Sequence, residues 1–439
     1  MKKLFLLLLV ALTTFPIFAR DDEFPYTYQG KTLKYRLYDR YEGEEYYVVM
    51  GANKNIAGKV IIPSKITHNG KTYPVGSIFE YAFAECSGIT SVSIPNSVKV
   101  IGEGAFALCS GLTSITLPNS IEWIPSKFCG GCSNLRSVTI PETVTGIGSN
   151  AFGDCANLTT IILPDSIKSI PEGFCSMRKL ANSIAEKHPE IEDNIAMQKV
   201  VTKGLANRVH LTSINIPNSV TKIERNAFCF CVNLSSIKIP NSVTEIEAGA
   251  FSGCVNLTSI DIPNSVTELN GFNGCTGLTS IDIPNSVTEI YGFDYCTGLT
   301  TIKIPNSVTK ISAFNDCTGL TSIDIPNSVT KISAFNGCTG LTSIDIPNSV
   351  TTLNGFRDCT NLLSISIPNS ITELPLNWFS GKYPISGCTR LQTLYIQEGL
   401  NNEVKQKLME IIEKINKDRK SEPVKIVYYK ATEPSPLKK

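Results

Sequence analysis

Residues 317–335 read CTGLTSIDIPNSVTKISAF, and residues 338–356 read CTGLTSIDIPNSVTTLNGF, which is almost the same sequence one unit later. Within this unit, Ile323 and Ile325 flank an outward Asp, which is the period-2 pattern of a strand buried on one face. Pro326 ends that strand because it lacks an N–H for further pairing and holds the residue before it in an extended conformation. The unit therefore predicts a short strand followed by a turn.

The Pro of this unit, preceded by Ile or Leu, recurs at a nearly constant spacing. It stands at 95, 118, 141 and 164, then at 217, 240 and 263, and then at 284, 305, 326, 347 and 368. The spacing is 23 residues and later 21, and the gap from 164 to 217 is one 23-residue unit plus an insertion of 30. One unit cannot cover its own Leu, Ile, Val and Phe side chains, so the units must stack. We predict a repeat solenoid, mainly β, wound as a right-handed coil.

The unit resembles the BspA-like branch of bacterial leucine-rich repeats, written Leu-Thr-Ser-Ile-x-Ile-Pro-x-Ser-Val-Thr-x-Ile-Gly-x-x-Ala-Phe-x-x-Cys. The chain matches this pattern at 112–120, 144–155 and 234–254, and the resemblance covers about residues 75–397. It implies a curved solenoid, a surface or secreted location, and adhesion to host proteins or other cells. The later units depart from the pattern because two residues before Phe are missing, as in Leu269-Asn-Gly-Phe272. We expect this shortening to change the curvature from about residue 264.

The segments outside the repeats predict an export signal at the N-terminus and a cap at each end. Residues 1–19 hold two Lys, an apolar run and a small residue at Ala19, which is typical of a cleaved signal peptide. Residues 20–75 alternate Tyr with charged residues and predict a β cap that includes an Asn-Gly hairpin turn. Residues 398–430 predict a cap made of a helix and a strand, and residues 431–439 are rich in Pro and Lys and predict a disordered tail.

Between the caps, leucine-rich repeats are expected at 76–175 and 208–397, separated by a helical insertion at 176–207. Apolar residues recur in the insertion with charges between them, and Pro189 divides it into two helical pieces. One interpretation is a helical excursion packed on the convex side of the coil. The alternative is that a partner recognises it, because it is the one irregular element in a uniform array.

Charge and cysteine placement favour an exported protein that binds neither nucleic acid nor membrane. Removal of residues 1–19 leaves 38 basic and 39 acidic side chains, which gives no field for steering nucleic acid or an anionic surface. The first cysteine is Cys86, so a mature N-terminus lacks the thiol that lipid attachment needs. We predict a secreted or cell-surface monomer without membrane insertion.

Twelve of the fifteen cysteines, from Cys86 to Cys388, stand nine residues before the Pro position. Such a column predicts buried thiols that act as small apolar residues. Cys129 and Cys132 have redox-like C-x-x-C spacing, although Cys132 belongs to the column. Cys175 and Cys229 lie off the column. Each directly follows the filler Phe, the bulky residue that fills the interior of its unit, and the two units are consecutive. A disulfide between them, which would fasten the base of the insertion, is a further hypothesis.

The sequence offers little material for catalysis, and we expect neither enzymatic activity nor a cofactor. Its three histidines are not in metal-ligand spacing, and it holds no phosphate loop, zinc signature or nucleophile elbow. The carboxylates recur identically in each unit, whereas an active site needs different residues that converge on one place. No metal site is predicted.

The best candidate surface consists of polar columns on the outward, concave strand face of the later units. Hydroxyls and charges about 5 Å apart form an extended polar face suited to a protein or a glycan. We predict an adhesin-like module that contacts an extracellular protein or glycan; the alternatives are a structural scaffold without a specific ligand and a thiol-linked enzyme. The candidate residues are Thr258, Thr279, Thr300, Thr321 and Thr342 in one column, and Asp261, Asp282, Lys303, Asp324 and Asp345 in the other.

Overall fold

The computed structural model describes residues 23–39, 45–187, 201, 203–205, 209–376, 383–418 and 422–437. The signal peptide expected at 1–19 and the Pro189 break in the insertion lie outside these residues. The chain divides into two compact units, residues 1–168 and 169–439, which are taken in turn. Within the described residues, no helix is both long enough and apolar enough to span a bilayer.

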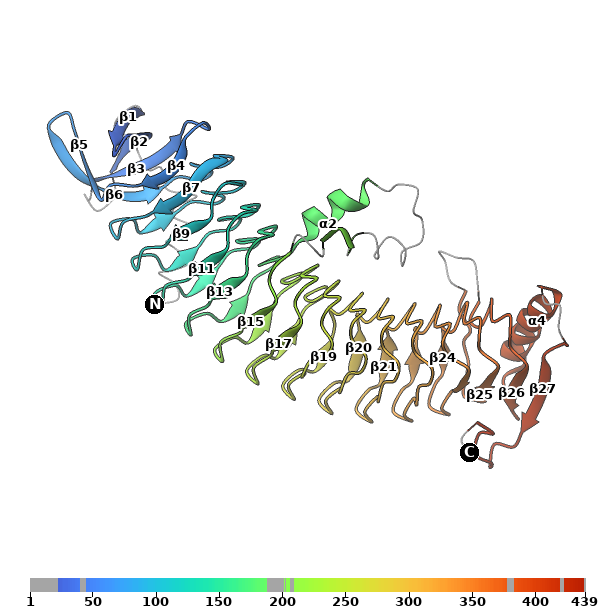
Figure 1. The fold of residues 1–439 in the computed structure, drawn as a ribbon. Coiled ribbons are helices and arrows are strands. Elements are labelled where there is room, and N and C mark those ends of the chain that lie inside the picture. The colour runs from blue at the N-terminus through green and yellow to red at the C-terminus, as the bar shows by residue number, and fades with distance from the viewer. Residues whose placement is uncertain are drawn as a thin grey trace. The chain divides into compact units, whose positions relative to one another are not determined.

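The first unit begins with a sheet built from residues before the regular repeats (Figure 1). Its strand order is β1-β2-β3-β6-β5, and β8 also pairs with β6. Asn69 and Gly70 join β5 to β6 with φ angles of 52° and 73°, as a two-residue hairpin turn requires. The strands are β1 (Phe24–Tyr28), β2 (Lys31–Asp39), β3 (Glu45–Ala52), β5 (Lys65–His68), β6 (Lys71–Ile78) and β8 (Val100–Ile101).

Each repeat forms one turn of the coil, which we call a rung. The rungs of the first unit stack as parallel strands in the order β13-β11-β9-β7-β4. Each residue pairs with its equivalent one rung later, as Ser91 does with Ser114, and hydrogen bonds such as Thr113 to Thr90 join residues 23 apart. The strands are β4 (Ala57–Ile61), β7 (Gly88–Ser93), β9 (Ser114–Thr116), β11 (Ser137–Thr139) and β13 (Thr160–Ile162), and a second edge carries the parallel pair β10 (Trp123–Ile124) and β12 (Gly146–Ile147).

The second unit continues the same design with two strand edges per rung. The Thr-Ser-Ile-x edge forms β15 (Ser213–Asn215), β17 (Ser236–Lys238), β23 (Ser343–Asp345), β25 (Ser364–Ile367) and β26 (Thr393–Gln397), and single bridges connect the rungs between β17 and β23. The other edge forms β14 (Ser169–Ile170), β16 (Lys222–Ile223), β18 (Glu245–Ile246), β19 (Glu268–Leu269), β20 (Glu289–Tyr291), β21 (Lys310–Ser312), β22 (Lys331–Ile332) and β24 (Thr352–Leu353). In the later rungs, hydrogen bonds such as Thr300 to Thr279 join residues 21 apart.

Two of the side-chain columns in the interior of the second unit are formed by Phe and Cys residues, beside columns of buried Leu, Ile and Val. From Phe228 to Phe356, successive Phe rings are stacked with centroids 5.1–5.6 Å apart and interplanar angles of 7–18°. From Cys275 to Cys359, each column thiol donates a hydrogen bond of 3.0–3.3 Å to the carbonyl of the preceding rung's Phe. The sulfur is therefore buried with its weak donor satisfied.

The insertion packs against the corner of the rungs and not against their strands. This corner is the turn that lies two residues after the buried Phe of each rung, at positions 230, 253, 274 and 295. Its described helix is α2 (Arg178–Ala185), and Val201 and residues 203–205 are also helical. Met177, Ala181, Val201 and Leu205 form a buried apolar cluster with Val232, and Phe230 packs against it. The α2 helix is thus held by apolar packing beside the rung corner (Figure 1).

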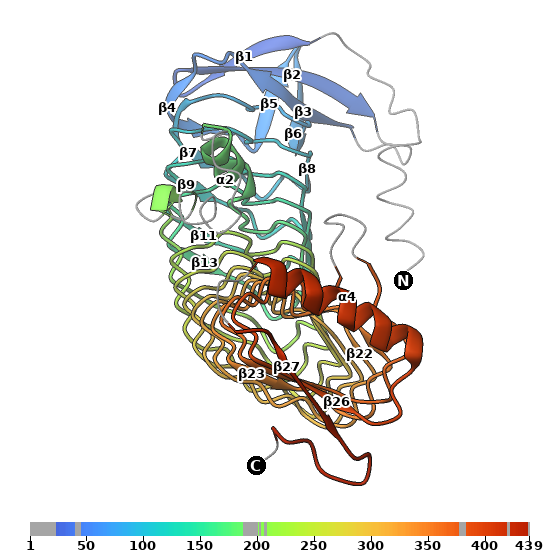
Figure 2. The ribbon, with the colours of Figure 1, turned by 90° about the vertical axis from the view of Figure 1, so that its right-hand side faces the viewer.

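The C-terminal end of the second unit is covered by α4 (Asn402–Asp418) and by β27 (Lys425–Tyr429), which pairs in parallel with β26 (Figure 2). The Oδ1 of Asn401 accepts hydrogen bonds from the amides of Glu403 and Val404 and caps the helix. The sequence predicts a disordered tail from residue 431 onward, whereas the structure describes residues 431–437 as ordered turns. They form turns in which the Ser435 hydroxyl donates to Ser366 at 3.0 Å, an anchor that composition does not reveal.

Candidate ligand-binding surface

We call strand face the outward side of residues 258–261, 279–282, 300–303, 321–324 and 342–345 in the second unit. Nine of the ten predicted residues have exposed side chains, and Asp345 is half-buried. Parallel bridges join Asp261 to Asp282, Asp282 to Lys303, and Lys303 to Asp324, which places these residues side by side in successive rungs. The charged column predicted from the sequence is therefore one row on the molecule.

The threonine column is tied to the backbone more tightly than its charged neighbour. The hydroxyl of Thr300 donates to the Thr279 carbonyl at 3.4 Å, and Thr321 repeats this bond to Thr300. These hydroxyls reinforce the contact between rungs, so fewer of their hydrogen-bonding positions remain for a ligand. They contribute to the rigidity of the strand face.

A third column, of small hydroxyl side chains, was not predicted from the sequence. Ser259 and Asp261 flank the buried Ile260, so both point outward from the same stretch. The pattern repeats in the following rungs, although Ile323 is only half-buried. The period-2 rule that assigns Asp261 to the surface assigns Ser259 to it as well. The column consists of Ser259, Ser280, Thr301, Ser322 and Ser343, all exposed.

Charges on the two edges of the rungs are arranged differently. On the second edge, Lys222 lies 3.0 Å from Glu245 and 2.6 Å from Glu247, and the hydrogen bond from Lys222 lowers the pKa of the Glu247 carboxyl. On the strand face, the carboxylates of Asp261 and Asp282 have no side-chain partner among the residues that the structure describes. The strand face therefore presents carboxylates available to an external donor.

The cysteines do not form a reactive pair. Cys129 and Cys132 are both fully buried, and burial raises the pKa of the Cys129 thiol. A hydrogen bond with Cys109 lowers the pKa of Cys132, whereas the hydrogen bond with Cys129 and burial raise it. The raising effects together outweigh the lowering one, so the pKa lies well above its ordinary value. A nucleophilic cysteine needs a lowered pKa and access, so this C-x-x-C is not a redox centre of the usual kind.

The disulfide hypothesised between Cys175 and Cys229 is not formed in the structure, where both residues are buried thiols. Burial raises the pKa of Cys229 to about 12. The base of the insertion is instead held by backbone hydrogen bonds, from Cys175 to the Ala227 carbonyl and from Met177 to the Cys229 carbonyl, and by the apolar cluster. Among the described residues, no group of three or more His, Cys, Asp or Glu side chains is arranged to hold a metal ion.

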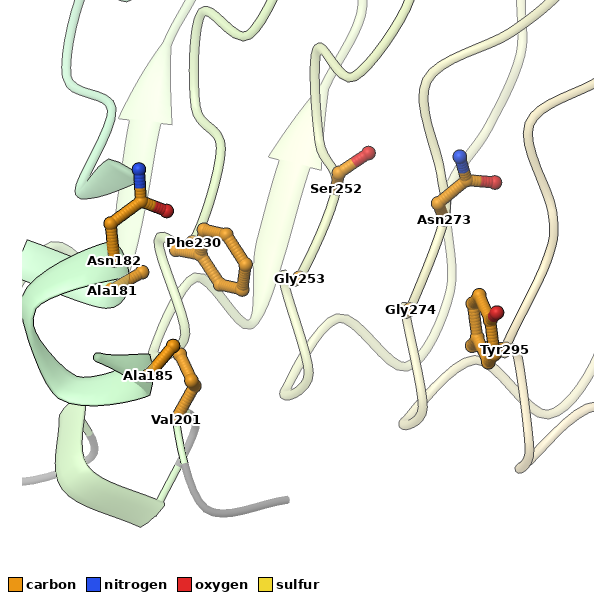
Figure 3. Close-up of a pocket in the computed structure, with 10 residues that line it drawn as sticks. All are labelled: Ala181, Asn182, Ala185, Val201, Phe230, Ser252, Gly253, Asn273, Gly274 and Tyr295. Carbon is orange, nitrogen blue, oxygen red and sulfur yellow. The ribbon is translucent and has the colours of Figure 1, made fainter. Parts of the chain in front are cut away.

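A pocket of about 390 Å³ lies between α2 and the rung corners (Figure 3). Phe230 and Tyr295 stand at the two ends of a row of corner residues, with Gly253 and Gly274 between them. Among the described residues, its lining from the insertion is Ala181, Asn182, Ala185 and Val201, and Ser252 and Asn273 also line it. No sequence pattern signals this pocket, because it depends on where the insertion packs.

A family model, the BspA type leucine rich repeat region, matches residues 62–195, 199–313 and 290–407. The fold is similar to a leucine-rich repeat protein from Bacteroides ovatus, with a TM-score of 0.60 and 26% identity over 94% of this chain and 99% of that one. It is also similar to the pneumococcal vaccine antigen PcpA, with a TM-score of 0.56 and 17% identity over 92% and 98% of the two chains. A comparison with curated proteins finds no match.

Proposed function

Because the chain belongs to the BspA-type leucine-rich repeat family, we propose that it is an exported surface or secreted protein that binds an extracellular macromolecule through its strand face. The observation that carries this proposal is the row Asp261, Asp282, Lys303 and Asp324, held in register by parallel bridges and exposed along its length. Such a row offers many weak polar contacts at a fixed repeat, which suits an extended protein or glycan.

Features of the strand face favour binding over a purely structural role. The backbone beneath it is fixed by hydrogen bonds between rungs, such as Thr321 N–H to the Thr300 carbonyl at 3.2 Å, so little conformational entropy is lost when a partner binds. Apart from Lys303, its outward side chains are short Ser, Thr and Asp residues that leave the face open. The thiol-linked enzyme is disfavoured by the burial of Cys129 and Cys132.

The test is a binding array of extracellular matrix proteins and glycans, probed with the secreted protein and with a variant that carries Asp261→Lys, Asp282→Lys, Asp324→Lys and Asp345→Lys. We expect the wild type to select at least one target and the variant to lose affinity by about tenfold or more. The matched control reverses four exposed carboxylates elsewhere, Glu122, Asp165, Glu268 and Glu413, and therefore has the same net charge.

If the wild type selects a target, the control variant still binds it and the strand-face variant does not, the strand face is the binding surface. Equal loss in both variants would mean that net charge, and not this face, determines binding. A wild type that selects no target would favour the structural scaffold. Fractionation of cells and medium tests the location, since a surface or secreted protein must be absent from the cytoplasmic fraction.

A further inference from the structure

Trp123 is an exposed aromatic residue on the second edge of the first unit. It belongs to β10, and 39% of the residue is exposed, although Trp is on average a well-buried residue type. The equivalent position carries a charged residue in later rungs, as at Lys222, Glu245 and Lys310. An indole at this polar position is therefore not explained by the repeat pattern.

The next rung carries the glycine that lets the indole lie against the backbone. Trp123 pairs with Gly146, and a Cβ at Gly146 would lie 2.1 Å from Cζ3 and 2.6 Å from Cε3 of the indole. The φ of Gly146 is not in the left-handed region, so the backbone conformation does not require glycine there. From Ser77 to Glu373, no other rung has glycine at this position. The indole ring is thus the reason for the glycine.

Two other aromatic residues of the first unit cover a glycine, and they provide a structural comparison. Tyr81 lies over Gly104, but the φ of Gly104 is 58°, and the tyrosine hydroxyl donates to a glutamate carboxylate at 2.6 Å. Tyr46 lies over Gly76 and is half-buried. Such cover can stabilise a sheet by itself, and this structural role is the alternative that the experiment must exclude.

Trp123 differs from these residues because its ring and its polar atom remain available. Among the residues that the structure describes, no other aromatic ring and no cation lies against the indole, and no acceptor binds its N–H. The residue therefore combines exposed apolar surface with an unused hydrogen-bond donor.

Polar groups stand beside the indole in the two rungs that it spans. Glu122 precedes Trp123 and Thr145 precedes Gly146, and both side chains are exposed. The Thr145 amide and hydroxyl donate to the Glu122 carbonyl at 2.9 and 3.3 Å, which leaves the hydroxyl oxygen as an acceptor. The Glu122 carboxylate has no side-chain partner within the described part of the chain. Two acceptors thus stand next to the ring and its donor.

We propose that Trp123, with Glu122 and Thr145, binds a neutral sugar ring of a glycan. The indole can stack on the C–H face of the sugar, whose hydroxyls can donate to the two acceptors and accept from the indole N–H. The Glu122 carboxylate would repel an anionic sugar. A single exposed ring among polar groups fits a small ligand better than a protein interface, which buries roughly 800 Å² on each partner.

The experiment follows the fluorescence of Trp123 in the full secreted protein. The chain has two tryptophans, so Trp378→Phe leaves Trp123 as the one emitter. The protein is titrated with maltotriose, cellotriose and triacetylchitotriose. We expect at least one sugar to shift the emission saturably and to protect it from acrylamide quenching. Isothermal titration calorimetry then gives the affinity of the wild type and of each variant for that sugar.

Two variants test the indole and its position. Trp123→Val introduces the residue that stands at the equivalent position 100, and it should lower the affinity by about tenfold or more. Gly146→Ser introduces the residue of position 169 and keeps the indole, but its Cβ displaces the ring, so it should weaken binding as well. The matched control Tyr428→Ala removes an aromatic side chain of the second unit that is 47% exposed, and it should bind normally. Urea unfolding verifies that each variant is folded.

This site and the strand face give opposite results in the two charge-reversal variants. The strand-face variant should bind the sugar normally. The control variant of that experiment carries Glu122→Lys and should lose the sugar. Failure of this inference and failure of the proposed function are therefore distinguishable.

The inference is overturned if none of the three sugars binds the wild type, or if Trp123→Val binds as tightly as the wild type does. Normal binding by Gly146→Ser would overturn the assigned position of the ring. A peptide library that binds through Trp123, when the sugars do not, would assign the residue to a protein partner and likewise overturn the inference.

Discussion

Twelve rungs bury a cysteine at the same place, and the surroundings of that residue determine its chemistry. Burial raises the pKa of Cys86 to about 11 and that of Cys359 to about 12. In an unfolded chain a thiol ionises near pH 8.5. The folded state therefore keeps these residues neutral at pH values where the unfolded chain has lost the proton.

This difference predicts a stability that falls in alkali. Because the folded pKa values are raised, the contribution of the thiols is fully present below about pH 8.5 and is lost as pH rises toward 11–12, where the unfolded state binds fewer protons. Urea unfolding at pH 7, 8.5 and 10 should show this decline.

At pH 8 a disulfide reagent should leave all fifteen thiols, Cys175 and Cys229 included, largely unmodified until the protein is unfolded. Rapid reaction of any pair in the native protein would contradict this assignment.

Among the elements, the rung is the unit of folding, and its filler Phe is the largest side chain that it buries. Phe314 is fully buried, with its ring centroid 5.3 Å from that of Phe293 and 5.6 Å from that of Phe335. We predict that Phe314→Ala lowers the free energy of unfolding by about 3–5 kcal/mol, measured by urea denaturation. Leu108→Ala removes a side chain that is 53% exposed and should change it by less than about 0.5 kcal/mol. Equal effects of the two variants would mean that the Phe column is not the core.

Much of each rung was predictable from its own residues. Ile323-Asp-Ile325 specifies an inward and outward alternation, and the helical spacing from Val404 to Ile415 predicts the helix that the structure has at 402–418. The second strand edge was not predicted, because its strands are only two or three residues long and carry no readable period. The left-handed φ of 66° at Phe314 was also unpredictable, because shortened rungs differ at this point: in the rungs of Phe272 and Phe293 the preceding glycine has the positive φ instead.

The candidate sites were predictable only in part. The ten strand-face residues follow from the repeat, because equivalent positions stack, and the exposed serine column follows from the same rule once it is applied to both sides of Ile260. The pocket between α2 and the rung corners could not be found this way. It requires α2 to pack against Phe230, and that contact joins residues whose separation in the sequence contains no period.

At the scale of the whole molecule, the strand face depends on the stacking of equivalent residues. An outer column of threonines shows this most clearly, since each side chain is exposed and yet each amide is bonded to the rung before it. Thr309 N–H donates to the Thr288 carbonyl at 2.8 Å, and Thr330 to Thr309 at 2.9 Å. Only pairing between rungs can protect these amides from water.

Hydrogen exchange, resolved to single residues by mass spectrometry with electron-transfer fragmentation, therefore tests the stacking most directly. We predict that the amides of Thr288, Thr309, Thr330, Thr351 and Thr372 all exchange slowly and to a similar extent, while the turn residues Asn306 and Asn327 exchange fast. Exchange of these threonine amides at the rate of an unfolded peptide would contradict the stacking and, with it, the strand face as a binding surface.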